Sequence, residues 1–353
     1  MDRTVCELFA GVGGFRCGLN HILTADDYKK NQIWDTVWFN QYEPSEKSQY
    51  AHGCYRYHFG ISLDKDGNDT TNCDIETVDY SKIHDFNLLV GGFPCQNYSI
   101  ATTCNHANGI EGKSGVLWWS IQKILDIKQP PFVLLENVDR LLKSPAKQKG
   151  RDFAIILACF RDAGYSVEWR VIDASEYGYQ QRRKRIFIFA YKNSTVYYNN
   201  HKIDGNISSI ATILCKTGFF AKTFKVQPIF YNEIKFIDLQ DDIKSILDNF
   251  KFTFKDSGIM QNNKIFTSDI LPDYNGKTIT LYDILDDNVS ENYFISDNEL
   301  YYTNPYVTCS DETIGGGYLN KIGTHGNISK VQRKYGADPP QDLSIYTQKV
   351  LCL

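Results

Sequence analysis

Between residues 4 and 192 the sequence alternates short β-rich runs with segments of helical periodicity. The β-rich runs are TVCELF, TVWFNQYE, NLLVGGF, PFVLLENV, SVEWRVIDA and RIFIFAYK. Helical patterns separate the first five runs, and strands that alternate with helices form crossover units with parallel strands. This part of the chain is therefore predicted to be an α/β domain with a doubly wound, mostly parallel sheet. Ligands of such sheets bind beyond the carboxyl ends of the strands.

The composition and the periodicity of the sequence change after the sixth run. Only SEYGYQQRRK separates the fifth and sixth runs, which is too short for a crossover helix and predicts an antiparallel pair. Later, Asn, Lys, Asp, Phe and Tyr dominate, and periodicity weakens into short β-like runs such as GKTITLYDIL and LYYTNPYVTC. We therefore expect a large domain at 1–192, a smaller irregular or β domain at 193–315 and a loop-like tail at 316–353.

Composition narrows the class of protein. An apolar content of 42% over 353 residues suffices for a packed core. The sequence has no apolar run that would span a bilayer and no secretory signal at its start, so a cytoplasmic location is predicted. The ten cysteines form no C-x-x-C pair, so neither a disulfide framework nor a metal site is expected. A net charge of −4 argues against a protein that coats nucleic acid, but not against a local basic cleft.

Three polar or glycine-rich segments follow the first strands. In ELFAGVGGF, Gly11 and Gly13 would let the backbone turn tightly and approach a nucleotide-like ligand. A dinucleotide fingerprint needs a further glycine where Arg16 stands, so a plain tight turn remains the alternative. Glu43 is placed to accept hydrogen bonds from ribose hydroxyls, or it is a surface residue at a helix start. Asp74 suits an adenine amino group, or it caps a turn.

Further along the chain, four residues whose side chains could take part in catalysis or binding stand at the ends of predicted strands. Cys95 follows Pro94 at the end of a β-rich run, where its thiolate would face a crevice; the alternative is a buried structural thiol. Glu136 ends the next buried run, and a carboxyl there can donate to a ring nitrogen. Arg183 and Arg185 lie on the same side of an extended chain and suit phosphate oxygens or a base carbonyl, unless they are a solvated charge run.

These segments occur in a fixed order that matches a known family. FAGVGGFRCGL, GGFPCQNYS, LLENVDRLL and DASEYGYQQRRKRIFIFA resemble the motifs of the cytosine-5 DNA methyltransferases of bacterial restriction-modification systems, and the resemblance covers residues 3–192. It implies S-adenosylmethionine as cofactor, double-stranded DNA as partner and methyl transfer to cytosine carbon 5 by a monomeric enzyme. The implied cofactor pocket is lined by Phe9, Gly11, Gly13, Glu43, Pro44, Asp74, Ile75 and Pro94.

The resemblance also implies a role for each catalytic residue. Cys95 would add to carbon 6 of a flipped-out cytosine, and Glu136 would contact ring nitrogen 3 and the exocyclic amine. Arg183 and Arg185 would contact the ring carbonyl and nearby phosphates. The domain at 193–315 would recognise the target sequence in the major groove.

The C-terminal sequence departs from this family. Members normally carry an Arg-Leu-Gln-type segment and then a Gly-Asn-Ser/Ala segment with a final helix, and the stretch after GTHGNISKVQRKYGADPP shows neither. We therefore expect these motifs to be missing, or to be supplied by a second polypeptide. The alternative functions are a tRNA cytosine-5 methyltransferase and a noncatalytic DNA-binding remnant. A nicotinamide-dependent oxidoreductase is disfavoured because Arg16 breaks the glycine fingerprint.

Overall fold

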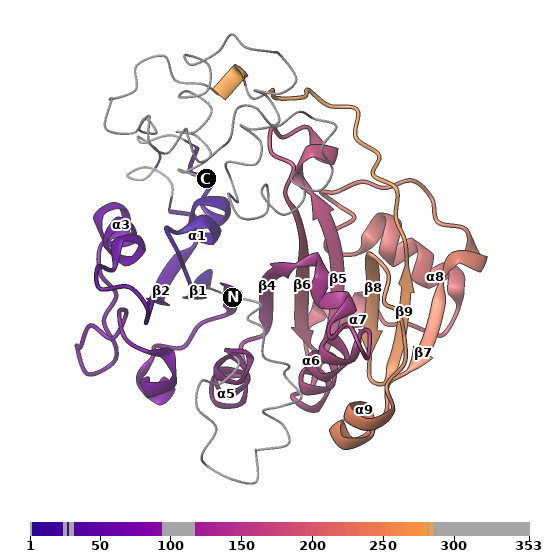
Figure 1. The fold of residues 1–353 in the computed structure, drawn as a ribbon, viewed down its shortest axis with the longest axis horizontal. Coiled ribbons are helices and arrows are strands. Elements are labelled where there is room, and N and C mark those ends of the chain that lie inside the picture. The colour runs from indigo at the N-terminus through magenta and orange to yellow at the C-terminus, as the bar shows by residue number, and fades with distance from the viewer. Residues whose placement is uncertain (1, 24–26, 28–31, 94–116, 281, 285–353) are drawn as a thin grey trace, which may run out of the picture. The chain divides into compact units, whose positions relative to one another are not determined.

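The computed structural model describes residues 2–23, 27, 32–93, 117–280 and 282–284. The chain divides into two compact units, one formed by residues 1–178 and 182–276 and the other by residues 179–181 and 277–353. Figure 1 labels the main helices and strands of the first unit. All strands of the described residues belong to the first unit. In the second unit, the described residues include one 3-10 turn, η7 (Tyr282–Ile284).

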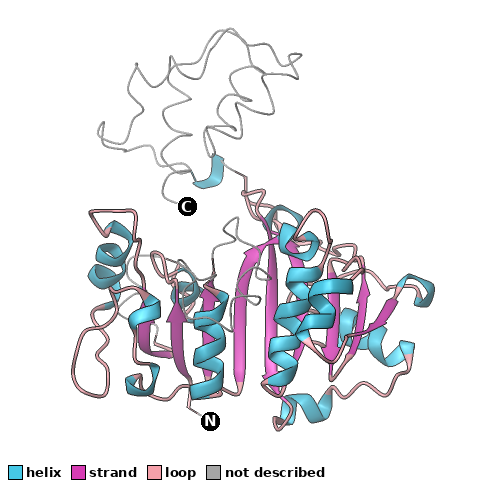
Figure 2. Ribbon diagram, turned by 60° about the horizontal axis from the view of Figure 1, so that its bottom comes forward, coloured by secondary structure: helices cyan, strands magenta, loops and turns pink. Residues whose placement is uncertain are grey.

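The first unit is built on a sheet of nine strands in the order β2-β1-β3-β4-β6-β5-β8-β9-β7 (Figure 2). The strands are β1 (Thr4–Leu8), β2 (Asp35–Asn40), β3 (Leu88–Gly92), β4 (Phe132–Val138), β5 (Tyr165–Asp173), β6 (Lys184–Lys192), β7 (Lys235–Asp238), β8 (Ser257–Gln261) and β9 (Lys264–Ser268). The first four are parallel, and the β4–β6 and β5–β6 pairs are antiparallel. The six predicted strands and the antiparallel last pair are thus confirmed.

The later part of the sheet differs from the sequence-based expectation. Strands β8, β9 and β7 continue the same sheet beyond β5 through antiparallel pairs, so the sheet is longer and more mixed than predicted. The expected β-like run at 276–285 is wrong for its described part, which is irregular up to residue 280 and then forms η7. Alternating Thr and Ile favour extended structure, but a strand also needs a partner edge. The proposed 192/193 domain boundary stays a prediction.

Helices cover both faces of this sheet. They are α1 (Gly14–Leu19), α3 (Tyr50–Phe59), α5 (Trp118–Lys128), α6 (Arg151–Asp162), α7 (Val196–Asn200), α8 (Ile207–Thr212) and α9 (Ile243–Asn249). On β4, Val133 and Leu135 belong to the hydrophobic core beneath α5, α6 and α9. Leu134 points to the opposite face of the sheet, where it packs against one apolar cluster that includes residues of α1 and another that includes residues of α7. This alternation follows from the two-residue period of a strand and confirms the doubly wound arrangement.

The strand register brings the predicted site segments to one edge. Leu8 of β1 lies opposite Asn40 of β2 and Gly91 of β3, and Gly92 lies opposite Glu136 of β4. The loops that follow these four strands therefore begin side by side at the carboxyl edge of the sheet. Within the described part of the chain, no helix is long and apolar enough to cross a membrane.

Candidate active site

The glycine turn after β1 contains three residues in the left-handed backbone region, which favours glycine over other residues. Phe9, Gly11 and Gly13 have φ angles of 53°, 56° and 93°. A Cβ built on Gly13 would lie 2.5 Å from a ring carbon of Phe59, so this position needs glycine for space as well as for conformation. The Gly11 N–H donates to Gln41 Oε1 at 2.7 Å, which ties the turn to the end of β2.

The segments after β2 complete this corner of the sheet. Glu43 is half-buried, and its N–H donates to Gln49 Oε1 at 2.9 Å, while Pro44 beside it is exposed. Asp74 is exposed and accepts from the Glu76 N–H at 3.0 Å, so it caps a 3-10 turn, η1 (Ile75–Thr77). This is the capping role that the sequence left as the alternative. The structure thus ties the turn at Gly11 to the segment that carries Glu43, and whether these residues form one cofactor pocket stays a prediction.

Sequence reasoning missed the amides that hold this corner in place. Gln41 and Gln49 fix the glycine turn and Glu43, and Asn72 Nδ2 donates to the Gln41 carbonyl at 2.7 Å. Amides both donate and accept, so they can join loops that have no sheet partner. The position of Gln41, directly after the strand and before Glu43, was the available signal. Ile75, by contrast, is buried in the hydrophobic core.

At the end of β4, Glu136 faces two guanidinium groups. Its Oε1 lies 2.8 Å from Arg185 Nε and 3.6 Å from Arg183 Nη2. The exposed fractions of the three side chains are 20% for Glu136, 25% for Arg185 and 46% for Arg183. Burial lowers the pKa of Arg183, and nearby Arg185 adds to this effect while Glu136 opposes it. The arrangement is a half-buried carboxylate in close contact with Arg185 and in a longer ion pair with Arg183.

The other oxygen of Glu136 points toward the end of β3. A Cβ built on Gly92 would lie 3.2 Å from Glu136 Oε2, so the glycine leaves room for the carboxylate. No hydrogen bond to Oε2 is found among the described residues. One oxygen of Glu136 is therefore held by the arginines, and the other faces the end of β3.

The next residue, Asn137, anchors the chain that leads to the predicted nucleophile. Its Nδ2 donates to the carbonyl of Phe93 at 2.9 Å, and both residues are buried. Pro94 and Cys95 follow directly and lie outside the described residues. A side chain of β4 thus fixes the last described residue before them, and this contact was not predicted from the sequence.

A buried carboxylate lies beneath the glycine turn. Glu7 of β1 is 1% exposed, its Oε2 accepts from Tyr55 Oη at 2.8 Å, and its Oε1 has no partner among the described residues. Burial raises the pKa of Glu7 to about 7. The Arg16 guanidinium donates to Tyr55 Oη at 3.4 Å and lies 4.6 Å from the Phe59 ring centre. Arg16, which stands where a dinucleotide fingerprint would need glycine, therefore belongs to this network.

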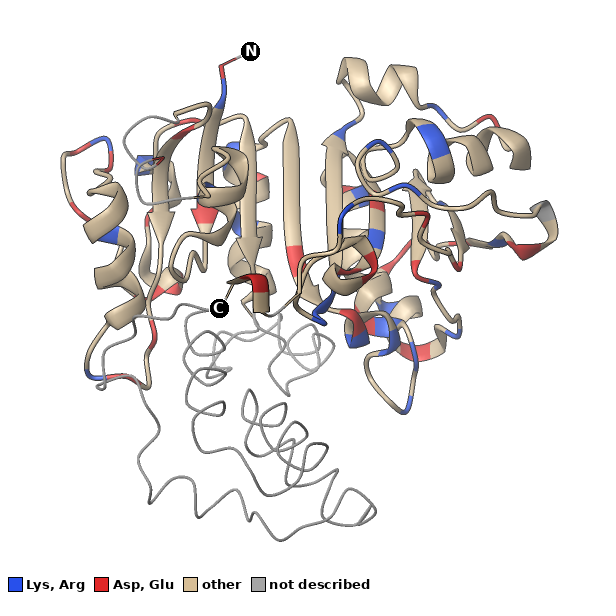
Figure 3. Cartoon of the chain, turned by 90° about the horizontal axis from the view of Figure 1, so that it is seen from above, with Lys and Arg blue, Asp and Glu red and all other residues tan. Residues whose placement is uncertain are grey.

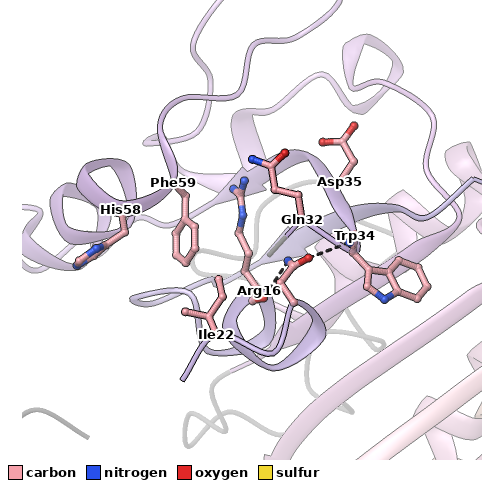
Figure 4. A pocket seen from close by; sticks show the side chains of 8 residues that line it. Arg16, Ile22, Gln32, Trp34, Asp35, His58 and Phe59 are labelled. Carbon is pink, nitrogen blue, oxygen red and sulfur yellow. Dashed lines mark hydrogen bonds between the residues drawn. The ribbon is translucent and has the colours of Figure 1, made fainter. Parts of the chain in front are cut away.

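A hollow of about 210 Å³ lies on the outer side of the same arginine (Figure 4). It is lined by Arg16, Asn20, Ile22, Gln32, Trp34, Asp35, His58 and Phe59. Asn20 shapes it by accepting from the Trp34 N–H at 2.8 Å. Asp35 begins β2, so the hollow reaches the amino end of that strand and is separate from the carboxyl edge that carries Glu136.

Comparison with known proteins identifies the family. A model of the C-5 cytosine-specific DNA methylases matches residues 3–338. The chain belongs to this family. Methylases of this kind use S-adenosylmethionine as the methyl donor and act on cytosine in DNA.

Two curated relatives show how the match is distributed. The chain is 42% identical over 299 residues to the Type II methyltransferase M.Sau3AI of Staphylococcus aureus, covering 84% of this methylase and 68% of the relative. It is 32% identical over 198 residues to M.NgoBI of Neisseria gonorrhoeae, covering 56% of this chain and 53% of the relative. The chain thus spans about half to two thirds of the length of these relatives.

A solved structure is also similar over part of the chain. A DNMT2 mutant of Spodoptera frugiperda has a TM-score of 0.38 and 16% identity, and the match covers 55% of this methylase and 51% of that protein.

Proposed function

We propose that this methylase transfers a methyl group from S-adenosylmethionine to carbon 5 of cytosine within a specific duplex DNA sequence, with Cys95 as the covalent nucleophile. The observation that carries the proposal is the Glu136 site, where one carboxylate oxygen meets two guanidinium groups and the other has no hydrogen-bond partner among the described residues. This site stands beside the strand that leads into Pro94 and Cys95. A carboxyl and two fork-shaped cations suit the polar edge of a cytosine.

The cofactor corner fits a nucleoside-containing methyl donor. The turn at Gly11 and Gly13 follows β1 at the edge of the sheet, with Gly11 half-buried and Gly13 buried, and the carboxylates of Glu43 and Asp74 follow β2. Carboxylates here suit ribose hydroxyls and an adenine amino group. Together with Phe9, Pro44, Ile75 and Pro94, these residues would hold the cofactor, whose sulfonium supplies an electrophilic methyl group.

The chain's own residues would activate the base. Carbon 5 of cytosine is a weak nucleophile, so the Cys95 thiolate adds to carbon 6 while Glu136 donates a proton to nitrogen 3 and accepts a hydrogen bond from the exocyclic amine. Carbon 5 then attacks the sulfonium methyl group, and the spent cofactor leaves as a neutral thioether. Loss of the carbon 5 proton to water or hydroxide expels the thiolate, and nitrogen 3 returns its proton to Glu136. Arg183 and Arg185 hold Glu136 and orient the ring carbonyl or phosphates. A base inside a duplex cannot reach Cys95, so the nucleotide is flipped out.

The proposal is tested by trapping the covalent complex. Purified protein is incubated with S-adenosylmethionine and mixed-sequence duplex DNA that contains 5-fluorocytosine, because fluorine cannot leave carbon 5 as a proton does. We expect an adduct that survives denaturing electrophoresis and is absent in Cys95→Ala. An adduct that persists in Cys95→Ala would contradict the assigned nucleophile. A protein that binds S-adenosylmethionine but forms no adduct would contradict the proposed reaction.

The cellular setting is proposed from the relatives. The curated relatives are Type II methyltransferases of bacteria, so we propose that this methylase protects DNA in the bacterial cytoplasm as part of a restriction-modification system. Expression in a bacterium without endogenous cytosine methylation, followed by bisulfite sequencing, should show one methylated sequence. Methylation spread over unrelated sequences would contradict a site-specific enzyme.

A further inference from the structure

A segment that follows α8 presents positive charge to solvent. Residues 213–225 begin with a π-helical turn, η5 (Ile213–Thr217), and carry the exposed side chains of Lys216, Lys222 and Lys225. Residues 205–232 contain no Asp or Glu. None of the three lysines forms an ion pair with another residue that the structure describes. In Figure 3, blue Lys and Arg segments gather, together with some acidic ones, on loops of the later part of the chain.

The backbone of this segment is held from beneath by a buried carboxylate. Glu168 of β5 is 4% exposed, and its Oε2 accepts from the Phe219 N–H at 2.9 Å. Its Oε1 accepts from Tyr197 Oη at 2.8 Å. A Cβ built on Gly218 would lie 2.6 Å from Glu168 Oε2, so the backbone approaches the carboxylate closely. Glu168 thus binds the backbone of the segment and does not use the lysine side chains.

A buried arginine on the same face of β5 completes the support. Arg170 is 2% exposed; its Nη1 donates to the Phe224 carbonyl at 2.8 Å, and its Nη2 donates to the Leu214 carbonyl. Leu214 and Phe224 stand near the two ends of the segment, so one guanidinium joins both. The planar fork of arginine suits two carbonyls in a way that a lysine ammonium does not.

Such burial is expensive in free energy. Burial raises the pKa of Glu168 and lowers the pKa of Arg170, so each side chain resists carrying its charge inside the protein. Buried ionic groups contribute little net stability compared with apolar residues, and their retention fits a role in fixing one conformation. Here the conformation that they fix is that of an acid-free, lysine-bearing loop.

The supported segment ends at the same edge of the sheet as Glu136. Strands β4 and β5 both pair antiparallel with β6, so their carboxyl ends point the same way. Tyr177, in the 3-10 turn η4 (Ala174–Tyr177) after β5, donates from Oη to the Lys225 carbonyl at 3.3 Å. Lys225 is therefore at the edge where the base would be processed.

We propose that residues 213–225 are a phosphate-contacting element of the DNA interface, in which Lys216, Lys222 and Lys225 neutralise backbone phosphates of duplex DNA while Glu168 and Arg170 act as positioning residues. The inference rests on the proposed function. Lysines at such contacts give affinity that is independent of sequence and strongly dependent on salt.

The test compares two triple variants of the full chain. Binding of a fluorescent mixed-sequence DNA duplex is followed by anisotropy over a salt series for wild type, for Lys216→Gln/Lys222→Gln/Lys225→Gln and for the control Lys123→Gln/Lys244→Gln/Lys264→Gln. The control removes the same charge from exposed lysines on α5, α9 and β9. We expect the first variant to bind more weakly and to lose about 2 to 3 from the slope of log K against log salt, at roughly one per lost phosphate contact. The control should keep the wild-type slope.

A second variant addresses the positioning residues. Arg170→Lys keeps the charge but cannot bridge both carbonyls, so a folded variant should lose part of the same salt slope with unchanged S-adenosylmethionine binding. An unchanged slope in the lysine triple variant overturns the inference while leaving the proposed function intact. Stronger competition by a tRNA-sized RNA than by duplex DNA also overturns it. A wild-type protein that binds S-adenosylmethionine but no duplex DNA contradicts the proposed function itself.

Discussion

Glu7 should make the stability of this methylase fall as pH rises through neutrality. The side chain is 1% exposed, and burial raises its pKa from 4.5 to about 7. Below pH 4.5 both the folded and the unfolded chain bind the proton. Between pH 4.5 and 7 only the folded chain keeps it, so the free energy of unfolding decreases as pH rises. At ~1.4 kcal/mol per pKa unit, the total loss above pH 7 is about 3 kcal/mol.

Glu7→Gln isolates this effect because glutamine has the same shape, remains neutral and still offers an oxygen to Tyr55 Oη. We expect the variant to exceed wild type in free energy of unfolding by up to about 3 kcal/mol at pH 8.5, by only about 1 kcal/mol at pH 5, and not at all below pH 4.5. Urea unfolding at both pH values measures it. Glu46→Gln, on the exposed surface, is the matched control and should keep the wild-type pH profile.

A raised pKa of Glu7 is refuted if the difference in free energy of unfolding between Glu7→Gln and wild type is the same at pH 8.5 as at pH 5. That result would mean that Tyr55 and the nearby Arg16 compensate an ionised Glu7 fully. The expected result would instead show a carboxylate kept beneath the cofactor turn at the expense of stability. Such a balance is common at functional sites.

Three further variants probe the catalytic edge. Asn137→Ala leaves the buried Phe93 carbonyl without its donor. It should lower the free energy of unfolding, measured with urea, by about 1–3 kcal/mol. It should also reduce the single-turnover rate of methyl transfer more than the affinity for S-adenosylmethionine measured by calorimetry. Gly92→Ala places a Cβ 3.2 Å from Glu136 Oε2 and should lower kcat in steady-state assays of a fully folded enzyme; an unchanged kcat would exclude a role for that oxygen. Glu136→Gln should lower kcat by roughly 100-fold or more while circular dichroism stays unchanged, and wild-type turnover would contradict its assigned role.

The strand positions could be predicted because a buried strand appears in the sequence as a short run of apolar residues. β4 reads PFVLLENV, and both the apolar run and its end at Glu136 are visible in the sequence. These features depend on periods of two residues and on short connections, which a single sequence displays. The ion pair of Glu136 with Arg185 was not predicted, although both residues were expected at strand ends, because it depends on β4 and β6 being neighbours in the sheet.

The anchoring contacts could not be predicted in the same way. Gln41 to Gly11 and Asn137 to Phe93 join residues that are distant in sequence, and an amide after a strand has many possible partners. Strands β7 to β9 were missed because β7 is mostly exposed and β8 contains a glycine, so neither shows a clear apolar alternation. Their place in the sheet depends on the free edge of β5, which no local pattern reveals.

The end of β4 shows how one strand can position both the carboxylate proposed to contact the base and the segment that leads to the proposed nucleophile. Successive side chains of a strand point to opposite faces, so Glu136 and Asn137 must face different ways. Glu136 turns toward the two arginines, and Asn137 turns to the carbonyl of Phe93, the residue after β3. The carboxylate for the base and the anchor for the nucleophile's loop are therefore one residue apart on a rigid strand. A shift of β4 by one residue would exchange these two roles and disable both, which explains why this strand end must be held by paired neighbours on both sides.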